Sequence, residues 1–400
     1  DLNTPNRLVK VGDKYGYDYI LRATNAALWG QTVYKSDFID FFLAGEGGYN
    51  TFNREGLMRN GLFPDNSFGK SKTYNFLTGR VKGGFLAKLN AHHAVFANAG
   101  YFSNMPRIEY IYISPRTRDF TVDNVGNAIT KTCEVGYELH LPGLFARITG
   151  YATDITNNTI VKRFWNDDPD FQSFVNYVMQ GVDTRSTGIE FSASYKISKS
   201  FTVTGVAAVG QSFYTNRPMV SIYNDNSPEM TPVQRRVYIQ NYYLGVGPQS
   251  IYSLGVKYQA AHALYINANV NYLDRNYVEI NPDRRTQVAT EMIDSNSTKW
   301  NNILAQEKLP SAYTVDLSAS RTFDIGKYVP KFRNGCRVTI NVGINNLLNN
   351  YSENFNVNIP SNLLIINKIY FGPLSPFGQY KYCFSFGFRH IFNANYIPYV

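Results

Sequence analysis

Hydrophobic and polar residues alternate along much of this chain. From Ser186 to Gln211, apolar residues such as Ile189 and Phe191 fall on one side, and polar residues such as Ser192 fall on the other. Side chains of a β-strand point alternately to its two faces, so this pattern predicts strands rather than helices. A short polar segment divides the stretch into two strands of about the 9–11 residues that a tilted strand needs to cross a membrane. Ordinary strands are shorter, with about 5–6 residues.

The same pattern predicts thirteen strands, near residues 14–34, 38–45, 73–88, 93–102, 132–140, 144–155, 187–197, 201–211, 250–259, 263–274, 312–323, 336–346 and 379–391. Short connections alternate with long polar ones, the long ones being 46–72, 103–131, 156–186, 212–249 and 275–311. Among the short connections, only the turn at 324–335 is longer than the others. In a bacterial outer-membrane barrel one rim carries short turns and the other carries long loops. We therefore expect an all-β protein, a transmembrane antiparallel up-and-down β-barrel.

The composition agrees with membrane strands. The chain has 400 residues, is 44% hydrophobic and has a mean hydropathy of -0.29, and it contains no long apolar run that would predict a membrane helix. A barrel strand places only alternate residues against lipid, so its average hydropathy resembles that of a soluble protein. The 31 Tyr and 27 Phe suit aromatic girdles at membrane interfaces. They would also suit a carbohydrate-binding β protein.

Charge and cysteine content restrict the partners. The net charge is +9, but the Lys and Arg residues are scattered, so nucleic acid is not expected as a partner. The charge indicates either simple solubility or a basic mouth that attracts anionic ligands. Cys133, Cys336 and Cys383 form no CxxC pair, which predicts free thiols and neither a zinc site nor a redox motif.

No motif indicates catalysis, so we expect no enzymatic activity, no cofactor and no metal site. The chain lacks a GxSxG elbow and an HExxH helix. His92 and His93 are adjacent in a predicted turn, and adjacent strand residues face opposite ways, which makes them a poor metal pair. The acidic stretches at 166–170 and 223–229 could bind calcium, but Asp and Asn are also common loop residues.

Ligand binding is the more plausible activity of the long loops. Arg and aromatic residues are preferred anchors in recognition sites. The candidates are Arg54, Arg59, Trp165, Tyr223, Arg235, Arg236, Tyr242, Arg284 and Arg285. Each could instead be a solvated loop residue or contact lipopolysaccharide phosphate. Arginine would suit an anionic cargo such as a siderophore, whereas tyrosine platforms would suit sugars.

Several stretches resemble the TonB-dependent outer-membrane receptors. CRVTINVGINNLLNNYS, from Cys336 to Ser352, is similar to the penultimate strand of that family. LPSAYTVDLSASRTF, with Asp316, is similar to the strand before it, and the stretch from Cys133 to Ile160 resembles a mid-barrel hairpin. FGPLSPFGQYKY resembles the approach to the last strand. Together these stretches cover most of residues 70–392.

The resemblance implies a 22-stranded barrel in the bacterial outer membrane, with about thirteen of its strands in this chain. Residues 1–392 would be the C-terminal portion of the barrel and residues 393–400 a C-terminal tail. We expect the N-terminal plug domain and the first strands of the barrel to lie outside this sequence. The protein would bind a siderophore, vitamin or oligosaccharide with its extracellular loops and import it through the plugged barrel.

The implied partners are outer-membrane lipid and lipopolysaccharide, TonB through the plug, a possible surface lipoprotein, and a small-molecule, glycan or peptide ligand. Three other functions stay open. The chain could be a passive outer-membrane pore of about fourteen strands, an adhesin or structural barrel, or a secreted glycan-binding enzyme. The odd number of predicted strands argues against the passive pore, because single-chain bacterial barrels have an even number.

Overall fold

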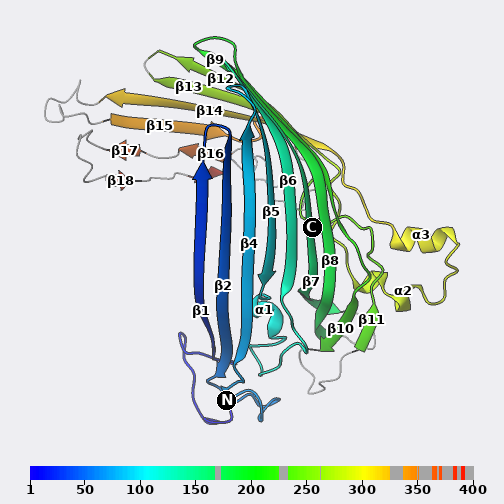
Figure 1. The fold of residues 1–400 in the computed structure, drawn as a ribbon. Helices are drawn as coiled ribbons and strands as arrows, with labels where there is room; N and C mark the ends of the chain where they lie inside the picture. Colours follow the sequence, from blue (N-terminus) through cyan, green and yellow to red (C-terminus); the bar gives the residue numbers. More distant parts are fainter. Residues whose placement is uncertain are drawn as a thin grey trace, which may run out of the picture.

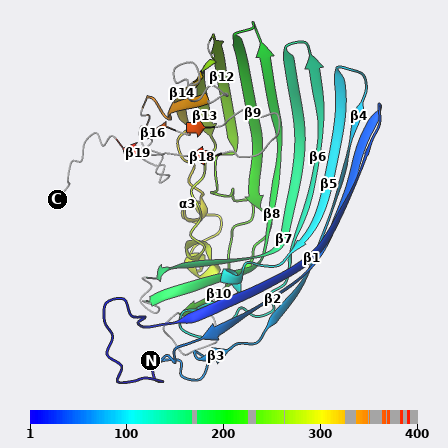
Figure 2. The ribbon, with the colours of Figure 1, turned by 90° about the vertical axis from the view of Figure 1, so that its left-hand side faces the viewer.

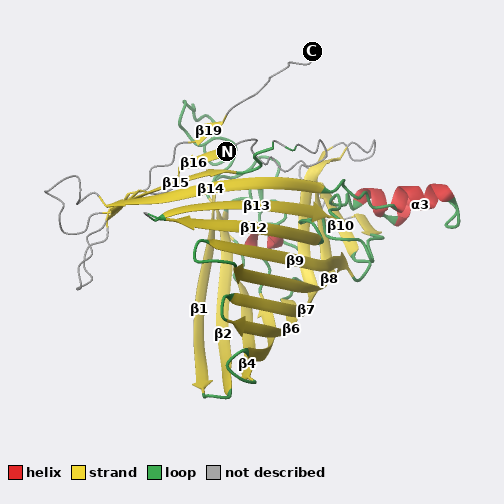
Figure 3. Cartoon of the chain, turned by 90° about the horizontal axis from the view of Figure 1, so that it is seen from above, coloured by secondary structure: helices red, strands yellow, loops and turns green. Residues whose placement is uncertain are grey.

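The computed structural model describes residues 1–166, 173–224, 233–261, 263–324, 337–348 and 350, and four short strands nearer the C-terminus. Antiparallel strands dominate it (Figure 1). The strands bend into a strongly twisted wall, so that β1 runs almost at right angles to β12 when the molecule is seen from above (Figure 3).

Strands that follow one another in the chain are neighbours in the sheet. The continuous antiparallel order is β1 (Tyr19–Lys35), β2 (Ile39–Gly56), β4 (Tyr74–Lys88), β5 (His93–Asn104), β6 (Ala128–Leu141), β7 (Leu144–Asn166), β8 (Ser173–Lys196), β9 (Phe201–Tyr214), β12 (Ser250–Ala260), β13 (Leu264–Asp274), β14 (Ala312–Asp324) and β15 (Arg337–Ile344). β16 (Leu363–Ile366) pairs with β15 and with β19 (Arg389–Ile391), while β17 (Ile369–Phe371) pairs with β18 (Tyr382–Phe384).

The predicted strands and short turns are confirmed wherever the structure describes them, except that the first strand begins at Tyr19 rather than near residue 14. The prediction at 379–391 is described only as β18 and β19. Its other residues lie outside the described part, as do residues 325–335 of the turn predicted at 324–335. β16 was not predicted. The loops predicted at 46–72 and 156–186 are partly wrong, because β2 continues to Gly56 and the β7–β8 hairpin continues to Asn166. Backbone pairing extends there beyond the alternating apolar pattern.

One face of the wall is apolar along the middle of the strands. The register places Phe41 opposite Phe85, and Ile148 opposite Phe191. Phe191 is 43% exposed, although it is a large hydrophobic residue. The opposite face carries polar pairs instead, such as the ion pair between Lys88 and Asp40. An exposed apolar face with a polar reverse face is the arrangement of a membrane barrel, in which one face meets lipid and the other lines the lumen.

Aromatic rows border the apolar face at both ends. Near the short turns the row consists of Tyr34, Phe41, Phe85, Tyr137, Tyr195, Phe201 and Tyr258. Towards the long connections it consists of Tyr49, Tyr101, Tyr252, Tyr272 and Tyr313. Beyond the second row the same face becomes charged, with ion pairs Arg22–Glu55, Arg185–Asp154 and Lys308–Asp274. These rows mark the two edges of the band that would lie in the membrane.

The long connections contain further short elements, namely β3 (Gly69–Lys70), α1 (Ile108–Ile111), β10 (Met219–Asn224), β11 (Val233–Arg236), η1 (Asp283–Arg285), α2 (Gln287–Thr290) and α3 (Thr298–Leu304). The buried hydrophobic clusters lie where these connections pack against the wall strands. None of the helices in the described residues has the length and apolar character needed to cross a membrane.

Candidate functional site

The connections between β9 and β14 fold onto the extended β7–β8 hairpin. Tyr177 and Met179 of β8 are fully buried in one cluster with Val237, Ile239 and Ile280. The short strand β10 pairs with β8 on one side and with β11 on the other. The loops at this end of the wall are therefore a packed structure that can hold side chains in fixed positions.

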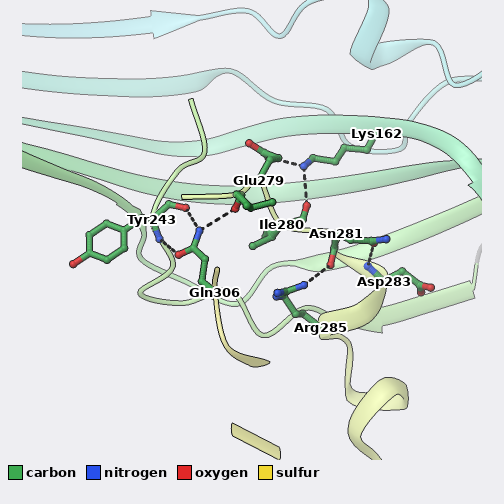
Figure 4. Close-up of polar contacts among 9 residues, drawn as sticks. Lys162, Tyr243, Glu279, Ile280, Asn281, Asp283, Arg285 and Gln306 are labelled. Carbon is green, nitrogen blue, oxygen red and sulfur yellow. Dashed lines mark hydrogen bonds and ion pairs between the residues drawn. The ribbon is translucent and has the colours of Figure 1, made fainter. Parts of the chain in front are cut away.

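Polar contacts attach the connection between β13 and β14 to this structure (Figure 4). The backbone N–H of Tyr243 donates to Gln306 Oε1 at 2.8 Å, and Gln306 Nε2 donates back to the Tyr243 carbonyl at 2.6 Å. Lys162 of β7 forms an ion pair with Glu279 and also donates to the Ile280 carbonyl at 3.2 Å. The start of the connection is thereby held against the hairpin, and its end is held against the connection between β9 and β12.

Arginine side chains converge around η1. Arg235 Nη1 lies 3.0 Å from Asp283 Oδ1, and the Tyr177 hydroxyl donates to the same oxygen at 2.6 Å. The backbone N–H of Tyr238 donates to the Arg285 carbonyl at 2.7 Å, which sets the segment after β11 beside η1. The Asp283 carboxylate is therefore already paired. It directly precedes Arg284 in the sequence.

Aromatic rings accompany these arginines. The Arg285 guanidinium lies 5.7 Å from the centre of the Tyr242 ring, and the Arg217 guanidinium lies 5.6 Å from that of Tyr238. The rings of Tyr238 and Trp300 are 6.1 Å apart. A hollow of about 440 Å³ opens beside them, lined by Arg284, Arg285, Ala289, Asn302, Ile303 and Ala305. We call Arg217, Arg235, Tyr238, Tyr242, Arg284, Arg285 and Trp300 the arginine–aromatic site.

The arginine–aromatic site favours an anionic group. Arg284 is exposed, and the hollow that it lines contains no acidic residue. Arg285 Nη2 donates to the Ala305 carbonyl at 2.9 Å. Burial raises the pKa of the Tyr242 hydroxyl, an effect that Arg285 partly opposes, so the ring stays neutral and its hydroxyl donates to the Leu304 carbonyl. Guanidinium groups bind carboxylates and phosphates through charge-assisted, often paired, hydrogen bonds.

Four of the candidates from the sequence meet in this site: Arg235, Tyr242, Arg284 and Arg285. The structure brings them together from two different connections. Their role in ligand binding stays a prediction. Arg235 is mainly engaged with Asp283, whereas Arg236, opposite Met219 of β10, and Arg284 are exposed.

The other candidates lie elsewhere. Arg54 is buried, with 2% of its surface exposed, and Tyr223 is buried against Phe120 at a ring distance of 5.2 Å. Arg59 is exposed, and its guanidinium lies 5.7 Å from the centre of the Phe68 ring. Trp165 is 58% exposed near the end of β7. Binding by these residues also stays a prediction.

Three members of the site were not predicted from the sequence. Arg217 and Tyr238 occupy the long connection that was read as polar loop, where nothing distinguishes them from their neighbours. Trp300 had a usable signal, because Ser297 precedes it as a helix N-cap and accepts a hydrogen bond from the Trp300 N–H at 3.1 Å. A capped helix would have indicated a folded connection.

The structure bears only in part on the predictions about His92 and about calcium binding. His92 lies in the β4–β5 turn, where its Nδ1 is 2.8 Å from the His140 carbonyl oxygen. Among the described residues, no three His, Cys, Asp or Glu side chains are placed to hold a metal ion. Most of the two acidic stretches proposed for calcium lies outside the described part of the chain.

A comparison with protein families identifies the fold. The family described as "TonB dependent receptor-like, beta-barrel" matches residues 2–347. This chain belongs to that family. The match covers the wall from its first strand through β15 and agrees with the resemblance seen in the sequence.

Several solved structures have a fold similar to that of this chain. The siderophore receptor PiuA from Acinetobacter baumannii aligns with a TM-score of 0.53 and 13% identity, over 84% of this chain and 41% of its own. The copper transporter OprC aligns at 0.52 and 12%, over 82% and 43%. The unliganded ferric citrate transporter FecA aligns at 0.51 and 12%, over 92% and 46%. This likeness shows the fold alone. The chain spans less than half the length of these proteins, and no curated protein matches it.

Proposed function

We propose that this chain is the barrel portion of a nutrient transporter of the bacterial outer membrane. Membership of the TonB-dependent receptor-like family supports the proposal, as do the aromatic rows that border the apolar face. Residues 1–392 form the barrel portion, and TonB drives import through a plug domain. A surface lipoprotein and lipopolysaccharide are further proposed partners. No enzymatic activity is proposed, because the family consists of transporters and receptors.

The cargo is an anionic complex that first binds at the arginine–aromatic site. The observation that carries this proposal is that Arg284 and Arg285 line one hollow, while the nearby carboxylate of Asp283 is already paired with Arg235. The similar structures include a siderophore receptor, a ferric citrate transporter and a copper transporter. A small anionic metal chelate is compatible with a hollow of about 440 Å³.

Uptake of radiolabelled iron(III) citrate and iron(III)–catecholate by cells that carry the full-length protein tests the proposal. We expect energy-dependent uptake that falls about tenfold in Arg284→Ala, because an exposed charge-assisted contact is lost. The matched control is Arg7→Ala, which removes an exposed arginine that is not a ligand candidate and should leave uptake unchanged. A labelled neutral maltooligosaccharide should not be taken up.

Different outcomes separate the alternatives. Uptake of the neutral sugar but of neither iron chelate would contradict an anionic cargo. Uptake that persists without cellular energy, together with a steady open-channel conductance in a planar bilayer, would favour the passive pore. Binding of either chelate without any entry into the cell would contradict transport.

A further inference from the structure

The connection between β5 and β6 folds towards the concave side of the wall. We call residues 105–127 the inner segment; its helix α1 lies on that side (Figure 2). Ile111 and Tyr112 are buried, at 1% and 0% exposure, in one cluster with Phe52 of β2. Tyr74 and Phe76 of β4 pack against the same cluster. These wall residues share the face that carries Asp40 and Lys88, which is the polar face turned away from lipid.

The opposite side of the inner segment contacts the extended β7–β8 hairpin. Ile113, Phe120 and Val122 form a cluster with Val161 of β7 and Val178 of β8. The inner segment therefore lies between two parts of the wall that are distant in sequence. It occupies space at the end of the wall where the long connections gather.

The inner segment has its own backbone structure. The N–H of Ile113 donates to the Phe120 carbonyl at 2.9 Å, and the N–H of Val122 donates to the Ile111 carbonyl at 2.8 Å. A turn closes the loop between them, with the Thr117 N–H donating to the Ser114 carbonyl at 3.1 Å. Such a hairpin moves as one body, so a few anchors are enough to fix it in place.

Arg54 of β2 is the first anchor. Its Nε donates to the Pro115 carbonyl at 2.7 Å, and its Nη1 donates to the Ser67 carbonyl at 3.0 Å. The side chain is 2% exposed, and its backbone N–H donates to Ser71 Oγ, which lies 3.0 Å from the Tyr112 hydroxyl. The two hydrogen bonds to carbonyls hold the guanidinium inside the protein, and its burial keeps it from being presented to a ligand.

Further anchors act from β7 and β8. Arg163 Nη2 donates to the Glu109 carbonyl at 2.8 Å and, more weakly, to the Tyr112 carbonyl at 3.3 Å. Gln180 Nε2 donates to the Asp123 carbonyl at 2.7 Å. The Arg54 and Arg163 side chains thus hold the same hairpin from opposite sides.

We propose that the inner segment is a fixed constriction of the lumen mouth and that Arg54 is a positioning residue that holds it there. Arg54 acts on cargo only through this segment, by limiting the size of what passes. This role is independent of which cargo is transported, and it differs from the ligand contact predicted for Arg54 from the sequence.

Hydrogen exchange in the unmodified full-length protein gives the first test. We expect the amides of Ile113, Asp119 and Val122 to exchange at least about a hundredfold more slowly than those of the exposed residues around Asn296, because they donate to internal carbonyls. Equally fast exchange in both regions would overturn the proposal, since a mobile lid would then occupy this place.

Thiol labelling gives the second test and isolates Arg54. In full-length protein with its native cysteines replaced by serine, Ile113→Cys places a thiol at a position that is 1% exposed. A bulky membrane-impermeant maleimide added to whole cells should label it slowly, and Arg54→Ala should raise the labelling rate at least about tenfold. Arg54→Lys, which retains the charge but donates less widely, should give an intermediate rate.

The control is Arg59→Ala, which should not change the labelling rate. Resistance of the folded barrel to dodecyl sulfate at room temperature confirms assembly of each variant. If Arg54→Ala does not assemble, the labelling rate of the Arg54→Lys variant tests the role of Arg54 instead. Labelling of an assembled variant at the parent rate would overturn the assignment of Arg54, whether or not uptake of iron chelates is affected.

Discussion

The Tyr177 hydroxyl donates a hydrogen bond of 2.6 Å to Asp283, although 106 positions separate the two residues in the chain. Tyr177 is fully buried in the extended hairpin, and Asp283 begins the short helix η1. Arg235 contacts the same carboxylate oxygen at 3.0 Å. This shared contact connects the hairpin, β11 and η1, and it determines where the neighbouring Arg284 and Arg285 are presented.

Tyr177→Phe should loosen this connection without leaving a cavity. The variant removes one hydrogen bond to a charged group, which contributes about 1.5–3 kcal/mol in folded proteins. We expect a loss of stability at the lower end of that range, because Arg235 remains on Asp283, together with weaker binding of iron(III) citrate. Thermal unfolding and equilibrium binding in detergent measure the two effects.

The matched control is Tyr15→Phe, because Tyr15 is 80% exposed. It should leave both the melting temperature and the binding unchanged. Equal melting temperatures for Tyr177→Phe and the parent protein would show that Asp283 is held by Arg235 alone.

Gly56 should not tolerate a side chain. A Cβ atom at this position would lie 1.8 Å from the Ser67 carbonyl oxygen and 2.7 Å from Arg54 Nη1. Gly56→Ala must therefore displace the backbone at Ser67 or the Arg54 guanidinium, at a cost of about 1–3 kcal/mol. Gly61→Ala is the control, since nothing lies within 4 Å of its Cβ position. Thermal unfolding of the two variants should differ clearly, and equal melting temperatures would contradict the close packing around Arg54.

The wall could be predicted from the sequence because lipid imposes the alternation. A residue such as Phe191 must be apolar and its neighbour Ser192 need not be, so the period of two is preserved along each strand. The alternation of apolar and polar residues weakens beyond the membrane edge. On β2, the polar residues Asn53 and Glu55 still occupy paired strand positions, but they no longer show an apolar face. The strand predicted at 38–45 therefore ended too early.

The candidate site could be predicted only in part. The doublets Arg235–Arg236 and Arg284–Arg285 were recognisable as charged loop residues, but nothing local in the sequence shows that two separate connections place them together. Arg54 looked similar to them in sequence, yet it is buried under the inner segment. Whether an arginine faces a ligand or a carbonyl depends on long-range packing, which a single sequence does not reveal.

Phe191→Arg and Ser192→Arg test the assignment of the two faces. The register places Phe191 on the apolar face, opposite Ile148, and Ser192 on the polar face, opposite Arg147. An arginine that faces lipid near the middle of the membrane costs about 2–4 kcal/mol. Phe191→Arg should therefore lower barrel stability by about this amount, and Ser192→Arg should cost much less. The free energy of unfolding in urea, measured in lipid vesicles, decides between them, and a reversed order would show that the faces are exchanged.

Asp119 should make the protein more stable at lower pH. It lies in the inner segment, where burial raises the pKa of its carboxyl above the ordinary value of about 3.9, while Arg54 opposes part of the shift. A carboxyl with a raised pKa binds its proton more tightly in the folded state. Its stabilising contribution is complete below the ordinary pKa and is lost as the pH rises through the raised value.

Asp119→Asn removes this titration. The melting temperature of the parent protein, measured relative to the variant, should rise as the pH falls from about 7 to about 4. Asp294→Asn, at an exposed position, should follow the parent protein over the same range. A difference between parent and Asp119→Asn that stays constant would mean that folding does not shift the pKa of Asp119. A difference that falls at low pH would mean that the carboxylate is stabilised in the folded state. In that case the attraction of Arg54 would outweigh burial at this position.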